Sequence, residues 1–315
     1  PQAHPEIVEH VRAQGRTPAG THVPVLVEEI LAALSPQPGD IVIDCTLGYG
    51  GHAERLLDRI LPTGRLIGLD LDAEQLEKTA SRLGDPERVV HENACNIAGP
   101  ERIVHTHACN FAGIGKVLRL EGRDACDIIL ADLGVSSMQL DDPTRGFSYK
   151  HDGPLDLRMD RRRPLTAARL LNTLSREELA EAFAELADEP DADRLARRIV
   201  ELRATRNLGT TRSLVDLVFQ IKGVSPRMWK ERATQDPSAL HPAARVFQAL
   251  RMLVNDELGS LRQLLRQAPY CLRPGGRIGV ISFHSGEDAI VEAFFNEGGS
   301  SGLYDAISEP PVVPG

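Results

Sequence analysis

The sequence predicts an α/β fold, in which a mostly parallel twisted sheet carries helices on both faces and an all-helical domain is inserted. Two observations lead to this prediction. Short apolar runs flanked by turns alternate with amphipathic stretches of helical period, a pattern typical of a parallel sheet that is buried on both sides. Between about residues 144 and 238 the strand pattern disappears and only helical patterns remain.

Four apolar runs are the expected strands, and they lie at 41–44, 66–70, 127–132 and 277–283. Amphipathic helices are expected after the first two strands, at about 51–60 and 73–82. In the helical stretch, Ser175 and Glu178 form a capping-box pattern that starts a helix. Further helices are expected at about 191–204 and 210–221. A long helix from about Pro242 is expected to return the chain to the sheet.

This order of elements predicts one core built from two parts of the chain. We expect a flexible leader at 1–20, the first part of the core at 21–143, an inserted helical domain for substrate recognition at 144–238, and the second part of the core at 239–315. No apolar run approaches the roughly 20 residues that a membrane span needs. Five cysteines without a Cys-x-x-Cys pair suit a reduced cytoplasmic protein.

Charge is unevenly distributed along the chain. The net charge is −9, but the stretch from Arg145 to Arg245 has 19 basic and 15 acidic residues, a balance of +4. The remainder has a balance of −13. RNA binding is therefore expected through the mildly basic stretch, without strong attraction from the protein as a whole.

An imperfect tandem repeat occupies residues 86–99 and 100–113. We expect only one copy to supply the third strand and its loop, with the other copy forming a surface extension. The His and Cys residues of the two copies resemble metal ligands in composition. Duplication explains them more simply, so we expect no metal.

A glycine-rich turn follows the first strand and has acids beside it. Gly48 and Gly50 let the backbone approach a ligand closely. Asp44, just before the turn, would repel a pyrophosphate but suits the cationic amino-acid end of S-adenosylmethionine. Asp70 ends the next strand, where a carboxylate can accept hydrogen bonds from ribose hydroxyls. A structural turn with a helix-capping acid is the alternative interpretation.

The third clear strand ends at Asp132, next to the expected position of the reactive methyl group. Asp132 is expected to hold the cofactor or to accept a hydrogen bond from an amine, with a helix cap as the alternative. The polar, turn-rich stretch 139–160 is expected to be an ordered lid rather than disordered. His284 follows the last strand, where it either orients substrate or cofactor or caps a helix.

At this point the sequence resembles the bacterial small-subunit ribosomal RNA cytosine-N4 methyltransferases, the MraW/RsmH family. The matching segments are 22–26, 44–52, 132–160, 241–251 and 274–285. The run at 132–160 is long and far more specific than a glycine turn. The sequence departs from the family pattern at Asp188-Glu189-Pro190 and at Gly286, and it has no basic tail after Gly315.

The resemblance implies a Rossmann-like methyltransferase core that uses S-adenosylmethionine and is interrupted by a helical domain. It also implies cofactor contacts at Gly50, Gly51, His52, Asp70, Phe111, Asp132 and Gln139. Phe111 is chosen because Asn110-Phe111 matches the family's Asn-Phe pair, whereas the first copy of the repeat has Ile97. The expected partner is small-subunit (16S) ribosomal RNA in the decoding region, and a homodimer remains open.

The mechanistic hypothesis is methyl transfer to the N4 amine of an unpaired cytosine. Asp132, or a backbone carbonyl near Gly134, accepts the hydrogen bond of the amine. Phe147 stacks on the base or is buried in the lid core. Arg158 and its neighbours meet phosphates or form a solvated face paired with acids.

Four other functions are weighed as alternatives. An enzyme that methylates DNA amino groups is disfavoured because Asp132-Leu133-Gly134-Val135 stands where such enzymes carry Asn/Asp-Pro-Pro-aromatic. A nicotinamide dehydrogenase is disfavoured by Asp44, and a hydrolase by the lack of a nucleophile elbow. A ribosome-assembly factor that binds without catalysis is disfavoured by the intact glycine turn and Asp132.

Overall fold

The computed structural model describes residues 24–83, 89–92, 103–205, 208–308 and 311–312. The chain divides into two compact units. One combines Pro1–Gly134 with Ser260–Gly315 and is called the sheet unit here; the other, Val135–Gly259, is the helical unit. The predicted leader at 1–20 lies outside the described residues. Among the described helices, none is both long and apolar enough to cross a membrane.

The sheet unit contains a six-stranded sheet in the order β3-β4-β2-β1-β5-β6, with every neighbouring pair parallel. The strands are β1 (Ile41–Asp44), β2 (Arg65–Asp70), β3 (Val89–Glu92), β4 (Val104–Ala108), β5 (Cys126–Asp132) and β6 (Leu272–Ile281). All four predicted strands are present, which confirms the parallel α/β core. The last of them, β6, begins five residues earlier than the predicted run at 277.

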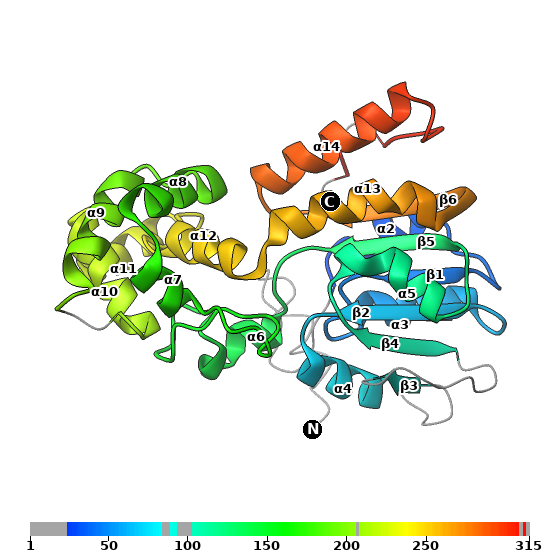
Figure 1. Cartoon of the computed structure of the whole chain (residues 1–315), viewed down its shortest axis with the longest axis horizontal. Coiled ribbons are helices and arrows are strands. Elements are labelled where there is room, and N and C mark those ends of the chain that lie inside the picture. Colours follow the sequence, from blue (N-terminus) through cyan, green and yellow to red (C-terminus); the bar gives the residue numbers. More distant parts are fainter. Residues whose placement is uncertain (1–23, 84–88, 93–102, 206–207, 309–310, 313–315) are drawn as a thin grey trace. The chain divides into compact units, whose positions relative to one another are not determined.

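Helices cover both faces of this sheet (Figure 1). One face carries α2 (Val27–Leu34), α3 (Gly51–Ile60) and α4 (Ala73–Arg82), and the other carries α5 (Ile114–Leu120), α13 (Glu257–Cys271) and α14 (Ser285–Ser300). In β1, Ile41 and Ile43 join the core beneath α5 and α13, whereas Val42 joins the core beneath α2 and α3. Alternate residues of one strand thus enter two cores, which explains its unbroken apolar run.

Both copies of the tandem repeat form strands, which corrects the expectation that only one would. The second copy supplies β4, beside β2, and the first supplies β3, which extends the sheet by one edge strand. The prediction failed because the first copy repeats a sequence that forms a strand. It can therefore form a strand as well and pair with the second copy. His105 and His107 of β4 contact the Glu121 carboxylate at 2.7 and 2.6 Å. Within the described residues, no group of three or more His, Cys, Asp or Glu could hold a metal ion.

The helical unit contains seven α-helices among its described residues and a single core. They are α6 (Ser137–Asp141), α7 (Ala167–Thr173), α8 (Arg176–Ala187), α9 (Ala192–Leu202), α10 (Thr211–Lys222), α11 (Pro226–Gln235) and α12 (Ala244–Asn255), with a 3-10 turn, η2 (Pro143–Arg145). The predicted capping box is confirmed: the Ser175 hydroxyl accepts the Glu178 N–H, and the Glu178 carboxylate accepts the Ser175 N–H.

The predicted boundaries at 144 and 238 differ from those of the helical unit, 135 and 259. The long helix expected from Pro242 is two helices, because Asp256 adopts a left-handed conformation with φ 52° between α12 and α13. Helix α12 packs against α7 and α8 rather than on the sheet. Only α13, whose Leu261 and Leu265 join the core of the sheet, returns the chain to it.

Candidate cofactor site at the carboxyl edge of the sheet

Three carboxylates end neighbouring strands at one edge of the sheet: Asp44 on β1, Asp70 on β2 and Asp132 on β5. Asp44 lies opposite Gly68 of β2 and Leu130 of β5. The other two carboxylates therefore lie two residues further along their strands. In parallel sheets this edge is where ligands bind.

The glycine turn after β1 is held against Asp70. The Asp70 carboxylate accepts the N–H of Gly48 at 2.9 Å and the N–H of Asp72 at 2.9 Å. Gly50 is the residue before α3 and has φ 79°, a conformation that favours glycine. A Cβ at Gly51 would lie 2.6 Å from Cγ of Pro24. A side chain at Gly50 or Gly51 would therefore be strained or would collide with its neighbours, so both positions require glycine.

Helix α4 supports the turn from behind. The Thr79 hydroxyl donates to the Gly48 carbonyl, and Arg82 Nε donates to the Tyr49 carbonyl at 2.9 Å. The Arg82 guanidinium also lies 4.2 Å from the centre of the Tyr49 ring. These contacts fix the turn before any ligand arrives.

Burial makes the carboxylate edge electrostatically unusual. It raises the pKa of Asp44 to about 7, despite the hydrogen bond from the Thr46 N–H, and Asp132 and Asp70 raise it further. Burial raises the pKa of Asp70 to about 6, against the lowering effect of the Asp72 and Gly48 N–H groups. Burial, followed by the nearby charge of Glu287, raises the pKa of Asp132 to about 7. Such a site favours a cationic ligand and disfavours a phosphate.

Asp132 joins the strand edge to the start of α3. Its carboxylate Oδ2 lies 3.6 Å from Nε2 of His52, and its N–H donates to the Thr46 hydroxyl at 2.7 Å. Its other oxygen, Oδ1, is buried and accepts no hydrogen bond from any described residue. An unpartnered buried oxygen is costly unless a ligand supplies a donor.

The segment after β6 contributes a residue that the sequence analysis missed. Glu287 is 2% exposed, and its carboxylate accepts the Phe283 N–H at 3.0 Å. His284 caps α14, because its Nδ1 accepts the Glu287 N–H at 3.3 Å, and its Nε2 lies 3.1 Å from Glu287 Oε1. The capping alternative for His284 is therefore confirmed, and its contact with substrate stays a prediction. An acid in the first turn of a helix is too common to identify Glu287 from the sequence.

The two remaining predicted cofactor residues lie in different units. Phe111 begins a 3-10 turn, η1 (Phe111–Gly113), three residues after β4, and packs partly buried against the core beneath α5 and α13. The preceding Asn110 fixes this turn by accepting the Ala112 N–H at 2.8 Å. Gln139 belongs to the helical unit, where its side chain accepts the Ser136 N–H at 3.1 Å. Its cofactor contact stays a prediction.

Two tentative substrate residues have structural roles in the helical unit. Phe147 is 5% exposed in the core of that unit, which favours the lid-core alternative over base stacking. Arg158 donates to both oxygens of Asp156 at 2.6 and 2.8 Å and to the carbonyls of Arg161 and Arg163. The Arg158 guanidinium can reach Asp156 because the two residues are only two positions apart. It therefore holds together the polar segment around it.

A parallel sheet of this order, with a glycine turn after β1 and carboxylates at the ends of β1, β2 and β5, defines the class of S-adenosylmethionine-dependent methyltransferases. Residues 19–304 match the model of the MraW methylase family. The chain belongs to this family.

Curated relatives are similar over most of their length. The ribosomal RNA small subunit methyltransferase H of Symbiobacterium thermophilum is 46% identical over 87% of this chain and 79% of its own. The ribosomal RNA small subunit methyltransferase H 1 of Agathobacter rectalis is 38% identical over 100% of this chain and 85% of its own. Among solved structures, an rRNA methylase from Streptococcus thermophilus covers 38% of this chain and 60% of its own, with 18% identity and a TM-score of 0.25.

Proposed function

We propose that the protein transfers the methyl group of S-adenosylmethionine to the exocyclic N4 of an unpaired cytosine in small-subunit (16S) ribosomal RNA, in the decoding region. The single observation that carries this proposal is the unpartnered Asp132 Oδ1 at the carboxyl edge of the sheet, because a target amine would supply its missing donor. Relatives named ribosomal RNA small subunit methyltransferases support the choice of RNA.

The residues at the edge fit the cofactor well. Asp70 would accept from the ribose hydroxyls, the backbone at Gly50 and Gly51 would approach the amino-acid end, and the buried Asp44 would offset its positive charge. His52 and Phe111 would line the same site. When bound, the cofactor supplies a methyl group on a positively charged sulfur. A pyrophosphate in the same place would face three buried carboxylates.

The protein must then overcome the weak nucleophilicity of the amine. The N4 lone pair is delocalised into the cytosine ring, so the amine must be held in line with the methyl group, about 3 Å away. Asp132 accepts a hydrogen bond from N4, which draws electron density toward the nitrogen as positive charge develops there. After the methyl group has moved, N4 carries an extra proton, and Asp132 receives it. A carboxyl group whose pKa is about 7 can hold that proton and release it to solvent.

The target base must leave its helix or loop to reach this edge, as for other enzymes that act on base atoms. We assign recognition of the surrounding RNA to the helical unit, whose sequence includes the mildly basic stretch. Because the substrate is ribosomal RNA, we expect the protein to act in the cytoplasm.

The test uses small ribosomal subunits that lack the modification. Incubation with methyl-labelled S-adenosylmethionine should place label on the N4 of a cytosine in the subunit RNA, as identified by nuclease digestion and mass spectrometry. Naked RNA and assembled subunits are compared in parallel. Label that appears only on DNA, or only on a different RNA atom, contradicts the proposal.

A further inference from the structure

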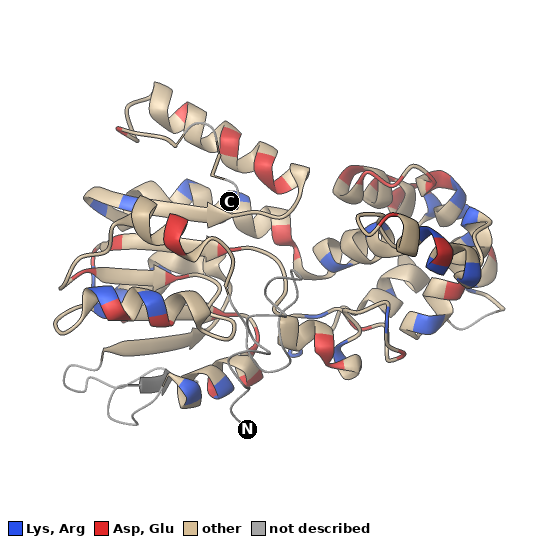
Figure 2. Cartoon of the chain, turned by 180° about the vertical axis from the view of Figure 1, so that it is seen from behind, with Lys and Arg blue, Asp and Glu red and all other residues tan. Residues whose placement is uncertain are grey.

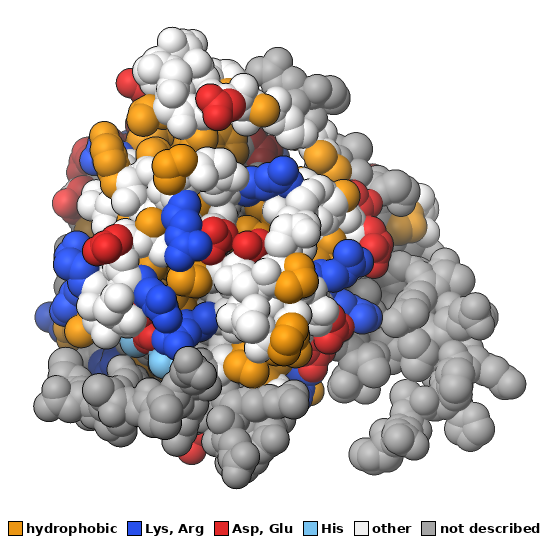
Figure 3. Space-filling model, turned by 90° about the vertical axis from the view of Figure 1, so that its right-hand side faces the viewer, with side chains coloured by type: hydrophobic (Ala, Val, Ile, Leu, Met, Phe, Trp, Pro, Cys, Tyr) orange, Lys and Arg blue, Asp and Glu red, His pale blue; other side chains and the backbone are white. Residues whose placement is uncertain are grey.

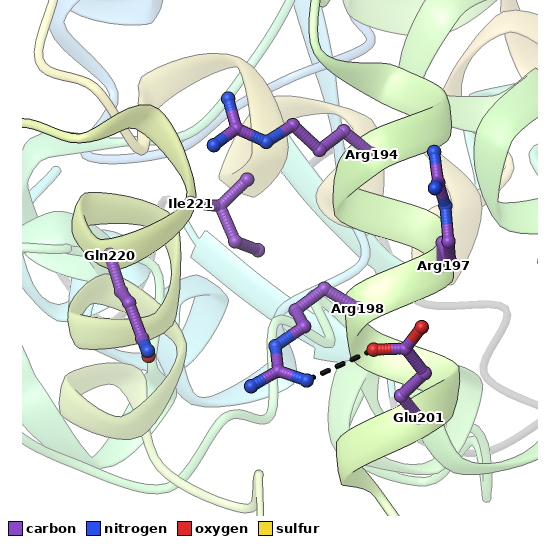
Figure 4. Close-up of a pocket in the computed structure, with 6 residues that line it drawn as sticks. All are labelled: Arg194, Arg197, Arg198, Glu201, Gln220 and Ile221. Atoms are coloured by element: carbon purple, nitrogen blue, oxygen red, sulfur yellow. Dashed lines mark hydrogen bonds and ion pairs between the residues drawn. The ribbon is translucent and has the colours of Figure 1, made fainter.

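A shallow groove of about 270 Å³ lies on the helical unit between α9 and α10 (Figure 4). It is lined by Arg194, Arg197, Arg198, Glu201, Gln220 and Ile221. Arg194 and Arg198 extend from α9 toward Gln220 and Ile221 of α10, whereas Arg197 lies further round α9 (Figure 4). The groove therefore has a cationic wall on one side and an amide and an apolar side chain on the other.

Arg194 and Arg198 form a like-charge pair that the protein only partly neutralises. They are four residues apart on one face of α9, where like charges destabilise each other. Arg198 pairs with Glu201 at 3.0 Å. Within the described part of the chain, Arg194 pairs only with Asp191, at 3.7 Å, which is too long for a hydrogen bond, and the Arg194 side chain is 60% exposed.

Neighbouring arginines compete for the same few acids. Asp193 is shared by Arg197 at 3.0 Å and Arg176 at 2.6 Å. Exposed ion pairs of this kind contribute little to stability, so an incoming anion can displace them at low cost. Figure 2 shows Lys and Arg interleaved with Asp and Glu along the helices of this unit. Figure 3 shows a face of the sheet unit, where basic, acidic and hydrophobic side chains are interspersed and no single broad basic surface stands out.

We propose that this groove binds the phosphodiester backbone of RNA, with Arg194 and Arg198 holding one phosphate and Gln220 available to a sugar or base edge. The inference rests on the proposed function and adds to it a named RNA contact on the helical unit. Guanidinium groups bind phosphate oxygens through paired N–H donors, and an anion between the two arginines removes their mutual repulsion. Phosphate contacts of this kind fix position on the RNA without reading its sequence.

An acidic protein segment is the other anion that arginines could take, and the groove suits it less well. Protein interfaces obtain most of their affinity from buried aromatic and apolar anchors. Among the residues that line the groove, only Ile221 is apolar. It is just 5% exposed because it packs in the core of the helical unit, so it offers little surface to a partner. A repeating phosphate backbone needs no such anchor.

The experiment compares the parent protein with the double variant Arg194→Ala/Arg198→Ala. The matched control is Arg262→Ala/Arg266→Ala, which removes two exposed arginines at the same spacing from α13. Binding of fluorescently labelled small-subunit RNA and of an unrelated single-stranded RNA is measured from 50 to 300 mM salt. Each lost phosphate contact lowers the salt slope of binding by about 0.7 for a single strand.

We expect the groove variant to bind both RNAs at least fivefold more weakly, with a shallower salt slope, and the control to match the parent protein. Affinity for S-adenosylmethionine should be unchanged, and methylation should show a raised KM for RNA with kcat retained. Equal RNA affinity and slope for the groove variant and the parent would overturn the inference. If the groove variant binds polyglutamate more weakly than the parent but binds RNA equally well, the inference is overturned and the groove is a site for an acidic protein segment. A parent protein that binds RNA through the groove but methylates none would instead refute the proposed function.

Discussion

Nε2 of His52 lies 3.6 Å from Oδ2 of Asp132, which brings the first turn of α3 against the end of β5. The contact links the glycine turn, proposed to hold the cofactor, with the carboxylate proposed to meet the amine. The Thr46 hydroxyl ties the same two segments by accepting the Asp132 N–H. The methyl donor and the proton acceptor would therefore share one rigid edge rather than separate mobile loops.

The substitution Asp70→Asn should weaken binding of S-adenosylmethionine by about 10- to 100-fold, because charged hydrogen bonds contribute roughly 1.5–3 kcal/mol. The variant loses both the charge proposed to lie beside the ribose and one of the two oxygens that accept the Gly48 and Asp72 N–H groups. Isothermal titration calorimetry measures the change. Asp58→Asn, at an exposed position of α3, is the control and should bind like the parent. If Asp70→Asn keeps the parent affinity, the cofactor assignment is wrong.

Binding of S-adenosylmethionine should strengthen as pH rises from about 5.5 to 8. The folded pKa values are about 7 for Asp44 and Asp132 and about 6 for Asp70, above the ordinary 3.8. These acids therefore contribute stability to the free protein below about pH 4, and that contribution is lost as pH rises through 6 to 7. A cationic ligand favours the ionised forms, so its binding releases protons in that window.

Thermal unfolding with and without the cofactor measures this coupling between cofactor binding and ionisation of the acids. The increase in melting temperature on adding a fixed excess of S-adenosylmethionine should be larger at pH 8 than at pH 5.5. The uncharged sulfur analogue S-adenosylhomocysteine should show a weaker pH dependence, because it lacks the sulfonium charge. An identical pH dependence for both ligands would argue against charge pairing at the sulfonium.

The substitution Glu287→Gln should move the acid limb of the kcat/KM profile to lower pH. The negative charge of Glu287 helps to raise the pKa of Asp132, so removing it lowers that pKa. Asp132→Asn should reduce kcat by about 10²- to 10³-fold, the range for loss of one group that stabilises a transition state. Glu292→Gln, exposed on the same helix, should leave the profile where it is. An unshifted limb in Glu287→Gln would show that Glu287 acts only in the fold.

Much of the sheet and its edge was predictable because the signals are local. The run Ile41-Val42-Ile43 contributes to two cores and must be apolar throughout. The acid that follows it, Asp44, is therefore expected at the end of the strand. Glu287 and Thr46 were not predictable as parts of the site. Thr46 meets Asp132 only when β1 and β5 pair, and the charge of Glu287 comes near Asp132 only when β5 and β6 pair.

The polar segment at 139–160 shows the limit of composition more clearly. Its paired charges fit an RNA contact and an internal network equally well until the distances are known. Arg145 donates to the carbonyls of Arg158 and Met159, and the Asn255 side chain accepts the Met159 N–H at 2.8 Å. These bonds hold the segment to α12, and no sequence pattern connects Asn255 with a residue almost a hundred positions earlier.

Removing one partner of the buried pair Glu189–Lys222 should destabilise the helical unit strongly. Lys222 Nζ lies 2.8 Å from the Glu189 carboxylate, and the Glu189 side chain is 0% exposed. Glu189→Ala leaves a half-buried ammonium without its acid, which typically costs about 3–5 kcal/mol. Urea unfolding followed by circular dichroism measures the loss. Glu231→Ala, which breaks the exposed pair with Arg227, should change the free energy of unfolding by less than about 1 kcal/mol.

Replacing Phe147 separates its two interpretations. If it is a core residue, Phe147→Ala should lower the free energy of unfolding by about 3–5 kcal/mol, because a large buried ring leaves a cavity. Phe147→Leu should cost less, since it fills part of the same volume, and at a temperature where it is folded it should bind RNA like the parent. Met228→Ala, at a side chain that is 54% exposed, should leave stability within about 0.5 kcal/mol. If Phe147→Leu has parental stability but has lost RNA affinity, base stacking is restored as the role of Phe147. The ring would then have to leave the core of the helical unit, which it shares with Leu155 and Leu157.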